Sequence, residues 1–420
     1  MKFDTPKNEN YAAVIAKVPA VLPIPGRDRI EQISIYGHTA VVQKGWKPGD
    51  LGVFFPAEVQ LSEKYARENN MYRHGNLNAD PGVTGYLEDN GRVKALKLGP
   101  ARSNALFMPL ESLESFGVMA GDFKEGDTFD HINGKEVCRK YVVRGSDKLP
   151  NNQAPKDRSK DRVDPRLFPQ HIDTANFWRN VARVDDRRVI VTQKLHGTSI
   201  RIGRVPVLRK LSLVERLAQR LGAKIQQREY DAVYGSRKVI KDANNEGQQH
   251  FYSEDIWTQK GREIDAVLPN GWILYGELIG WTPDGAPLQR GYTYEIPKGQ
   301  SRLYVYRIAV VNDQGVSVDL SYEAVVEFCK NNGLNHAPVV WSGHINLFNV
   351  NAWMDGNYAE EGVPGVVPAG AGVIDEGVVI RSEGITPTLL KAKSPLFLEH
   401  ETKVLDSGAE DIESAESIAA

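Results

Sequence analysis

The sequence predicts an α+β protein in two parts, a small N-terminal β-barrel of the OB-like kind and a larger domain built on antiparallel sheet. Over about the first 120 residues, short apolar or alternating stretches are separated by turns rich in Gly and Pro, such as Gly45–Asp50. Beyond residue 171, strand and helix patterns mix without the regular alternation of a parallel sheet. The length of 420 residues also exceeds one ordinary domain.

The N-terminal strands are predicted from alternation of apolar and polar residues and from short apolar runs. They are expected at residues 11–18, 39–43, 51–55, 93–98 and 105–110. This spacing is typical of a small barrel or sandwich, and periodicity does not distinguish an OB-like barrel from other small barrels. We assign residues 1–134 to an OB-like domain.

Two segments of biased charge flank the second domain. Residues 135–162 hold nine Lys or Arg against four acids, and 149–155 is turn-rich, which predicts a basic linker over 135–170. A solvated hinge without a binding partner is the simpler explanation of its charge. Residues 399–420 hold seven acids against one lysine, which predicts an acidic, disordered tail.

The second domain is expected over residues 171–398. Its strands are predicted at residues 188–194, 199–205, 272–279, 303–311 and 377–381, and its helices near 211–227, 253–267 and 321–332. This mixture favours an α+β domain around antiparallel sheet.

Composition excludes several classes of protein. The formal charge of −2 excludes binding of polyanions through bulk charge, although a local basic groove remains compatible with it. Cys138 and Cys329 form neither a disulfide framework nor a cysteine-rich zinc site. With no secretory signal pattern and no apolar run of 18 residues, the chain is expected to be intracellular and cytoplasmic. A phosphate-binding loop of the GxxxxGK[ST] type is absent from the sequence.

The segment QKLHGTSIRIG (193–203) places Lys194 at the end of an apolar strand, before a turn at His196 and Gly197. A lysine held this way can present its amine as a nucleophile. Alone the motif is weak, because a lysine at a hairpin end needs no function. An ordered series of segments follows it: GSRKVI with Arg237, LYGELIGW with Glu277, LYVYRIAV with Tyr306, DEGVVIR with Glu376, and LLKAKS with Lys391 and Lys393.

This series resembles the ordered motifs I, Ia, III, IIIa, IV and V of the covalent nucleotidyltransferases, the superfamily of polynucleotide ligases and capping enzymes. The form KLHGTS, with His196, is most similar to nick-sealing RNA ligases of the RNA ligase 2 type. DNA ligases and capping enzymes usually carry Asp at that position. The resemblance covers residues from about 188 to 395.

The resemblance implies an ATP-dependent RNA ligase. Such an enzyme joins 3′-hydroxyl and 5′-phosphate ends of RNA, here expected in a nicked duplex, through a lysyl-AMP intermediate and an adenylylated 5′ end. Its substrate nucleotide is ATP and its metal is Mg²⁺ or Mn²⁺. No membrane and no protein partner is implied.

The resemblance also implies a catalytic set of residues. Lys194 is the expected nucleophile, and it must be neutral to attack the α-phosphorus of ATP. Nearby cations favour a neutral amine and stabilise the charge of the transition state, and the candidates are Arg237, Lys391 and Lys393. Glu376 is the expected metal ligand, since Mg²⁺ prefers hard oxygen ligands and a few waters.

The remaining motif residues are expected to bind the nucleotide. Glu277 would bind the ribose hydroxyls, and Tyr306 would stack on adenine. His196, with Gly197, would contact the phosphates or orient the site. Water-exposed carboxylates and a core tyrosine are the simpler explanations of Glu277, Glu376 and Tyr306 taken one at a time.

Two positions depart from the family pattern. Gln193 precedes the lysine where related RNA ligases often carry Glu, and Arg307 follows Tyr306 where they often carry Asp. A missing acid at either position would affect metal use or the second and third steps of ligation more than the chemistry of the lysine.

A basic stretch follows the lysine motif. Residues 201–241 hold eleven Lys or Arg against three acids, and a helical stripe is predicted from the spacing of Arg216, Arg220, Lys224 and Arg228. Like charges in one row repel, so the stripe indicates a polyanionic partner, and we expect it to follow RNA phosphates. A merely solvated face remains an alternative, and a membrane-surface face is a weaker one.

In the N-terminal domain, Tyr36, Trp46 and Phe54 are candidates to stack on bases, although such residues are more often part of a core.

Two other functions remain open. One is another covalent nucleotidyltransferase, a DNA ligase or a capping enzyme that uses GTP, against which His196 and the N-terminal position of the barrel argue. The other is a catalytically inactive RNA-binding protein, against which the retained carboxylates and late lysines argue.

Overall fold

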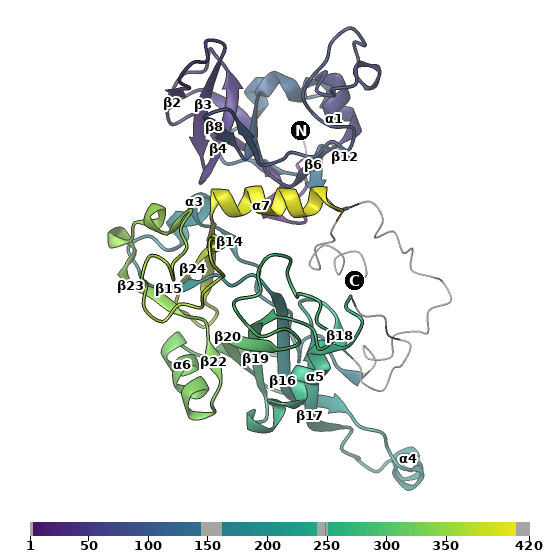
Figure 1. The fold of residues 1–420 in the computed structure, drawn as a ribbon. Coiled ribbons are helices and arrows are strands. Elements are labelled where there is room, and N and C mark those ends of the chain that lie inside the picture. The colour runs from purple at the N-terminus through teal and green to yellow at the C-terminus, as the bar shows by residue number, and fades with distance from the viewer. Residues whose placement is uncertain (1–2, 144–161, 242–247, 249–250, 409–420) are drawn as a thin grey trace. The chain divides into compact units, whose positions relative to one another are not determined.

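The computed structural model describes residues 3–143, 162–241, 248 and 251–408 (Figure 1). The chain divides into two units. The N-terminal unit consists of residues 1–143, 175–181 and 392–409, and the central unit consists of residues 144–174, 182–391 and 410–420.

A four-stranded antiparallel sheet forms the centre of the N-terminal unit. Its order is β10 (Thr128–Phe129), β1 (Ala13–Lys17), β5 (Leu51–Pro56) and β9 (Ala105–Pro109). One face packs against α1 (Glu63–Glu68) and the 3₁₀ segment Leu110–Phe116, and the other packs against β3 (Ile30–Ile35) and β4 (His38–Gln43). Burial of both faces explains why β5 is apolar without alternation.

The other strands of this unit pair in small separate sheets. β2 (Val21–Pro23) joins β3 and β4, while the two-stranded pairs are β7 (Leu96–Leu98) with β8 (Ala101–Ser103), β11 (His131–Ile132) with β12 (Lys135–Glu136), and β6 (Val59–Leu61) with β13 (Cys138–Lys140). β14 (Ala175–Asn176) and α3 (Phe177–Asn180) complete the unit with α7. Among the described residues the strands do not close into one barrel, so the expected OB-like barrel is not confirmed.

Two expectations for this unit are corrected by burial. Residues 135–140, expected in the linker, form β12 and β13, and Cys138 is fully buried because its strand pairs with β6. Phe54, a candidate for base stacking, is 1% exposed and lies in the core. Trp46 packs on Phe107 with ring centres 4.8 Å apart, and Tyr36 packs edge-on against Phe54 at 5.6 Å. Residues 144–161 of the expected linker lie outside the described residues.

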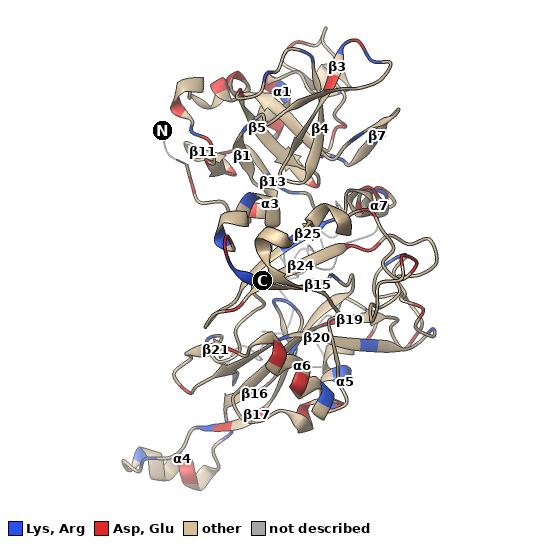
Figure 2. Ribbon diagram, turned by 90° about the vertical axis from the view of Figure 1, so that its left-hand side faces the viewer, with Lys and Arg blue, Asp and Glu red and all other residues tan. Residues whose placement is uncertain are grey.

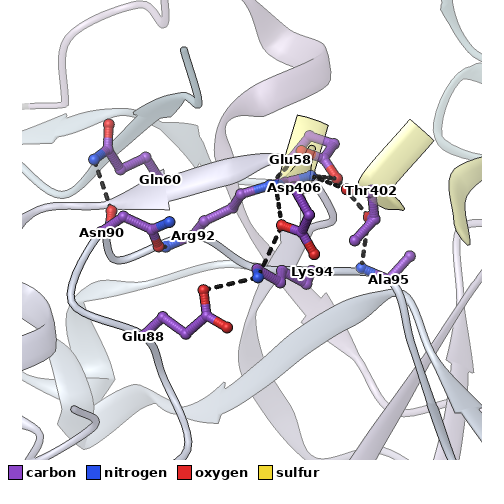
Figure 3. Close-up of polar contacts among 9 residues, drawn as sticks. All are labelled: Glu58, Gln60, Glu88, Asn90, Arg92, Lys94, Ala95, Thr402 and Asp406. Carbon is purple, nitrogen blue, oxygen red and sulfur yellow. Dashed lines mark hydrogen bonds and ion pairs between the residues drawn. The ribbon is translucent and has the colours of Figure 1, made fainter. Parts of the chain in front are cut away.

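Helix α7 (Pro395–Asp406) is held by a buried ionic network in the N-terminal unit (Figure 3). Arg92 donates from Nε and Nη2 to the two carboxylate oxygens of Glu58, at 2.7 and 2.8 Å. The hydroxyl of Thr402 donates to Glu58 Oε1 at 2.6 Å, and Arg92 Nη1 donates to Asp406 at 2.9 Å. Residues 399–406 are therefore helical, which corrects the expectation of a disordered tail there. Residues 409–420 of that tail lie outside the described residues.

The central unit contains two antiparallel sheets. In the larger one the order is β18 (Ile240–Lys241), β17 (Arg228–Gly235), β16 (Thr198–Leu208), β19 (Trp272–Gly280), β20 (Ser301–Val311) and β21 (Ser317–Asp319), with β22 (Asn335–His336) parallel to β20. The smaller sheet runs β25 (Thr388–Lys393), β24 (Gly377–Ser382), β15 (Arg188–Gln193) and β23 (Val339–His344). The predicted α+β fold with antiparallel sheet is confirmed.

Among the described residues of the central unit lie the helices α4 (Leu213–Arg220), α5 (Ile256–Arg262) and α6 (Tyr322–Asn331). Each begins at a side-chain N-cap, Ser212, Asp255 or Ser321. α5 and α6 bury Trp257 and Val325 in a core shared with Leu274 of β19. This core fixes the larger sheet, whose opposite face is then available for a site.

Within the described part of the chain, no helix has the length and apolar character needed to cross a bilayer.

Candidate active site

A cavity of about 110 Å³ lies between the two sheets of the central unit. The larger sheet contributes Ser199, Glu277, Tyr304 and Tyr306, and the smaller sheet with its extension contributes Thr192, Gln193, Lys194, Val379, Arg381 and Leu389. The structure therefore brings Lys194, Glu277, Tyr306 and Arg237, which also lines the cavity, to one place.

Lys194 follows directly after β15 and is bound to the β24 end of the sheet by both its backbone and its side chain. Its backbone N–H donates to the carbonyl of Gly377 at 2.9 Å, and its Nζ lies 2.8 Å from Glu376 Oε2. The Glu376 side chain is 2% exposed, whereas that of Lys194 is 23% exposed. The predicted nucleophile and the predicted metal ligand thus form an ion pair at the wall of the cavity.

Glu277 holds the turn that follows the lysine. Its Oε1 accepts from the backbone N–H of Gly197 at 3.0 Å, and its Oε2 accepts from the hydroxyl of Ser199 at 3.4 Å. A Cβ atom at Gly197 would lie 2.3 Å from the carbonyl oxygen of Leu278, so the turn requires glycine. Glu277 therefore sets the path of the chain next to Lys194 as well as lining the cavity.

Tyr306 reaches the cavity through an irregularity in the sheet. The register of β19 and β20 shifts there, since Tyr275 pairs with Arg307 and Gly276 pairs with Val305. Tyr306 is the extra residue of this bulge, a feature that is frequent beside active sites. Its hydroxyl lies 2.5 Å from His171 Nδ1. Tyr306 and Tyr304 both line the cavity.

His196 is positioned by two tyrosines that sequence reasoning missed. Its backbone N–H donates to the hydroxyl of Tyr294 at 2.6 Å, and its ring packs edge-on against Tyr292 at 5.0 Å. Its Nδ1 lies 3.8 Å from Glu376 Oε2. Burial raises the pKa of Tyr294, so its hydroxyl stays neutral.

Tyr294 and Glu295 both have a φ of 53°, in the left-handed region that residues with a side chain rarely adopt. Such strain is found at functional sites, where the surrounding structure maintains it. The sequence feature that points to Tyr292 and Tyr294 is the segment GYTYEIP (291–297), in which a Gly and two aromatic residues precede a Pro.

Arg237 is oriented by a carboxylate outside the motifs. Its Nη2 donates to Asp173 Oδ1 at 2.5 Å. This contact fixes one side of the guanidinium at the cavity, as a group that binds phosphate would require.

The two late lysines occupy different surroundings. Leu389 lines the cavity, and alternation along β25 puts Lys391 and Lys393 on the same strand face as Leu389, although neither lines the cavity itself. Lys393 falls in the N-terminal unit, where its Nζ pairs with Glu401 of α7 at 2.8 Å.

Both departures from the family pattern have structural partners. Arg307 is 4% exposed and donates to both carboxylate oxygens of Asp319. Gln193 is 2% exposed, and its amide hydrogen-bonds to Val367 and Asp375. In each case an acid from elsewhere in the chain lies beside the departing residue.

The predicted basic stripe is shorter than expected. α4 ends at Arg220, because Gly222 turns the chain at a φ of 90° and Arg228 already belongs to β17, paired with Leu208. Arg216 and Arg220 are therefore helical, whereas Lys224 follows the helix. Arg228 also lies 3.7 Å from the carboxylate of Asp164. The prediction of one helical stripe is wrong beyond Arg220.

The described residues contain no cluster of three or more His, Cys, Asp or Glu that would hold a metal without other ligands. Glu376 nevertheless fits a magnesium-type ion, which is often bound through one or two carboxylates together with waters and substrate phosphates.

The family model described as RNA ligase matches residues 187–393, just under half of the chain. No curated protein matches the chain by sequence.

Solved structures of Naegleria gruberi RNA ligase share the fold. The complex with PPi has a TM-score of 0.60 at 19% identity and covers 93% of this chain and 98% of that chain. A mutant solved with ATP and Mn has a TM-score of 0.61 at 18% identity, with 92% and 98% covered. These likenesses show that the chain shares the fold of these structures.

Proposed function

We propose that this protein is an ATP-dependent, nick-sealing RNA ligase of the RNA ligase 2 type that works through a lysyl-AMP intermediate on Lys194. The observation that carries the proposal is the 2.8 Å pair of Lys194 Nζ and Glu376 Oε2 at a cavity also lined by Glu277, Arg237 and Tyr306. These residue types supply a nucleophile, a carboxylate for a metal, a phosphate-binding cation and an aromatic wall.

In the first step, Lys194 Nζ attacks the α-phosphorus of ATP. A P–N bond forms, the bond to the bridging oxygen breaks, pyrophosphate leaves, and the amine loses a proton. Arg237 binds phosphate oxygens and stabilises their growing charge. Tyr306 stacks on adenine, Glu277 binds the ribose hydroxyls, and His196 with Gly197 orients the phosphates.

Glu376 would hold Mg²⁺ or Mn²⁺, which when bound neutralises phosphate charge. A mutant of Naegleria gruberi RNA ligase, whose fold this chain shares, was solved with ATP and Mn. Lys391 and Lys393 would supply further positive charge to the phosphates.

In the two later steps the adenylate is transferred and released. An oxygen of the RNA 5′-phosphate attacks the lysyl-AMP phosphorus, so that the P–N bond breaks and the amine is regenerated. The RNA 3′-hydroxyl then attacks the activated 5′ phosphorus, a 3′–5′ phosphodiester forms, and AMP leaves. Arg216 and Arg220, which share α4, would contact RNA phosphates.

The test is covalent labelling with α-labelled ATP or GTP and Mg²⁺, followed by denaturing electrophoresis. We expect label from ATP alone, absent in Lys194→Ala, and an adduct mapped to Lys194 by mass spectrometry. Label from GTP alone would identify a capping enzyme, and no label at all would identify an RNA-binding protein. Sealing of nicked duplexes with RNA or DNA strands then distinguishes an RNA ligase from a DNA ligase.

A further inference from the structure

Immediately beside the Lys194–Glu376 ion pair lies a second contact between the preceding residues, Gln193 and Asp375. Gln193 Nε2 donates to Asp375 Oδ1 at 2.7 Å, and both residues are 2% exposed. Two successive pairs of residues therefore connect positions 193–194 with positions 375–376. The first pairs a neutral amide with a carboxylate, and the second pairs an ammonium with a carboxylate.

The Gln193 amide also holds the loop that leads to Glu376. Its Nε2 donates to the carbonyl of Val367 at 2.7 Å, and its Oε1 accepts from the N–H of Val367 at 2.8 Å. Asp375 Oδ2 accepts from the N–H of Tyr358 at 2.8 Å, and its own N–H donates to the carbonyl of Gly356 at 2.9 Å. Asp375 thus joins the two ends of the segment 356–375, and Gln193 holds its middle at Val367.

The chemistry of these contacts requires one amide and one carboxylate. A carboxylate at position 193 would face Asp375 and the Val367 carbonyl, so three acceptors would meet in a buried space. An amide at position 375 could satisfy Tyr358 with its oxygen only by turning its NH₂ toward the Gln193 NH₂. Each single substitution therefore makes buried hydrogen-bond acceptors face one another, or buried donors face one another.

Building on the proposed ligase, we propose that Gln193 and Asp375 are a positioning pair that sets the register of Lys194 against Glu376. In this contact Gln193 supplies the amide and Asp375 supplies the acid. Neither residue reacts with the nucleotide. They hold the segment 356–375, and through it Glu376, in place against the nucleophile.

The test is a charge-exchange cycle of Gln193→Glu, Asp375→Asn and the double variant in the full chain. The readout is the rate of enzyme–AMP formation as ATP is varied. Each single variant is expected to lose about 100-fold in the rate at saturating ATP, the scale of a misplacement of about 1 Å. The ATP concentration at half-saturation is expected to change little.

The double variant restores one carboxylate and one amide with their positions exchanged, so that the hydrogen bond between the two side chains and the Tyr358 contact form again. It is expected to regain at least about tenfold over either single variant. The Val367 carbonyl stays unsatisfied, so recovery is incomplete.

A second readout does not depend on activity. Hydrogen exchange of peptides from residues 356–376 is expected to accelerate in both single variants and to slow again in the double variant. Gln193→Glu with wild-type rate and exchange, or a double variant no better than its parents in either readout, overturns the positioning pair. The wild type could form no AMP adduct while hydrogen exchange in the three variants changes as expected. That result would refute the proposed ligase but would still support the Gln193–Asp375 contact.

Discussion

At the scale of single residues, the site depends on side chains that hold neighbouring backbone and side-chain groups in place. Tyr294 holds the backbone of His196, Glu277 holds Gly197, and Asp173 holds Arg237. Sequence motifs identify the residues expected to touch the nucleotide. They do not identify Tyr294 and Asp173 as supports, because a supporting contact has no spacing rule of its own.

Tyr306 provides a test of the aromatic wall. Tyr306→Ala is expected to weaken ATP binding by roughly 10- to 100-fold, since stacking of one base on an aromatic ring contributes about 1–3 kcal/mol. Tyr306→Phe removes only the hydroxyl contact with His171 and is the matched control, with an expected change below about fivefold. Equilibrium binding of a fluorescent ATP analogue measures both. A loss of ATP affinity in Tyr306→Phe beyond this limit would show that the hydroxyl, not the ring, accounts for the binding.

His38 predicts a pH dependence of stability. Burial, helped by the charges of Arg179 and Lys393, lowers the pKa of His38 to about 4. Between pH 6.5 and 4 the unfolded chain binds a proton at this ring and the folded chain does not, so unfolding becomes easier as pH falls. The loss is expected to reach up to about 3 kcal/mol. Urea denaturation of the wild type and His38→Gln should give curves that agree at about pH 7 and diverge toward about pH 4.5, and a constant difference would contradict the assignment.

At the scale of elements, α4 is notable because no other described element covers it (Figures 1 and 2). It lies at the tip of the β16–β17 hairpin, and none of its residues is buried. Leu213 and Leu217, which helical spacing would assign to a core, are 83% and 59% exposed. Periodicity predicted the helix but not its surroundings, because no other described element reaches the hairpin tip.

The double variant Arg216→Glu with Arg220→Glu tests RNA binding at this helix. We expect weaker binding of all RNA sequences alike, and a salt dependence reduced by about two phosphate contacts. Arg262→Glu with Lys330→Glu, on α5 and α6 of the same unit, is the control with the same change in net charge. Fluorescence anisotropy at several salt concentrations measures the effect. RNA affinity unchanged at low salt would exclude α4 as a phosphate-binding element.

At the scale of the whole molecule, the N-terminal unit is completed by residues from the other end of the sequence. Arg92 and Glu58 contact Thr402 and Asp406 of α7, more than 300 positions away along the chain. A buried arginine requires its carboxylate partner, and here the partners come from both ends of the chain. We therefore expect residues 1–143 without α7 to be much less stable than the same unit in the full chain.

Arg92→Ala is the sharper measurement of this network. It leaves Glu58, which is 4% exposed, without its partner, and such a loss typically costs about 3–5 kcal/mol. Arg139→Ala, at an exposed arginine of the same unit, should cost less than about 0.5 kcal/mol. Guanidinium denaturation of both variants gives the comparison. Equal stability of the two variants would show that the network does not hold the unit together.

The sequence predicted the fold class and the strands of the central unit better than the layers of the N-terminal unit. The α+β class and most strands of the central unit follow from alternation, because a strand pattern is local. Helix α4 is shorter than its spacing predicts, because Gly222 turns the chain just after Arg220. The N-terminal layers were missed because a sheet buried on both faces loses the alternation from which its packing could be inferred.

By itself, the sequence determined which residue types stand in which order, and hence the candidate nucleophile, carboxylates and cations of a nucleotidyltransferase. Only the tertiary structure decided that Lys194 meets Glu376, that Gln193 meets Asp375 and that α7 completes the N-terminal unit. The physical reason is that periodicity records how each segment meets solvent and core within a few residues. Contacts between residues hundreds of positions apart form only when the sheets and their loops pack.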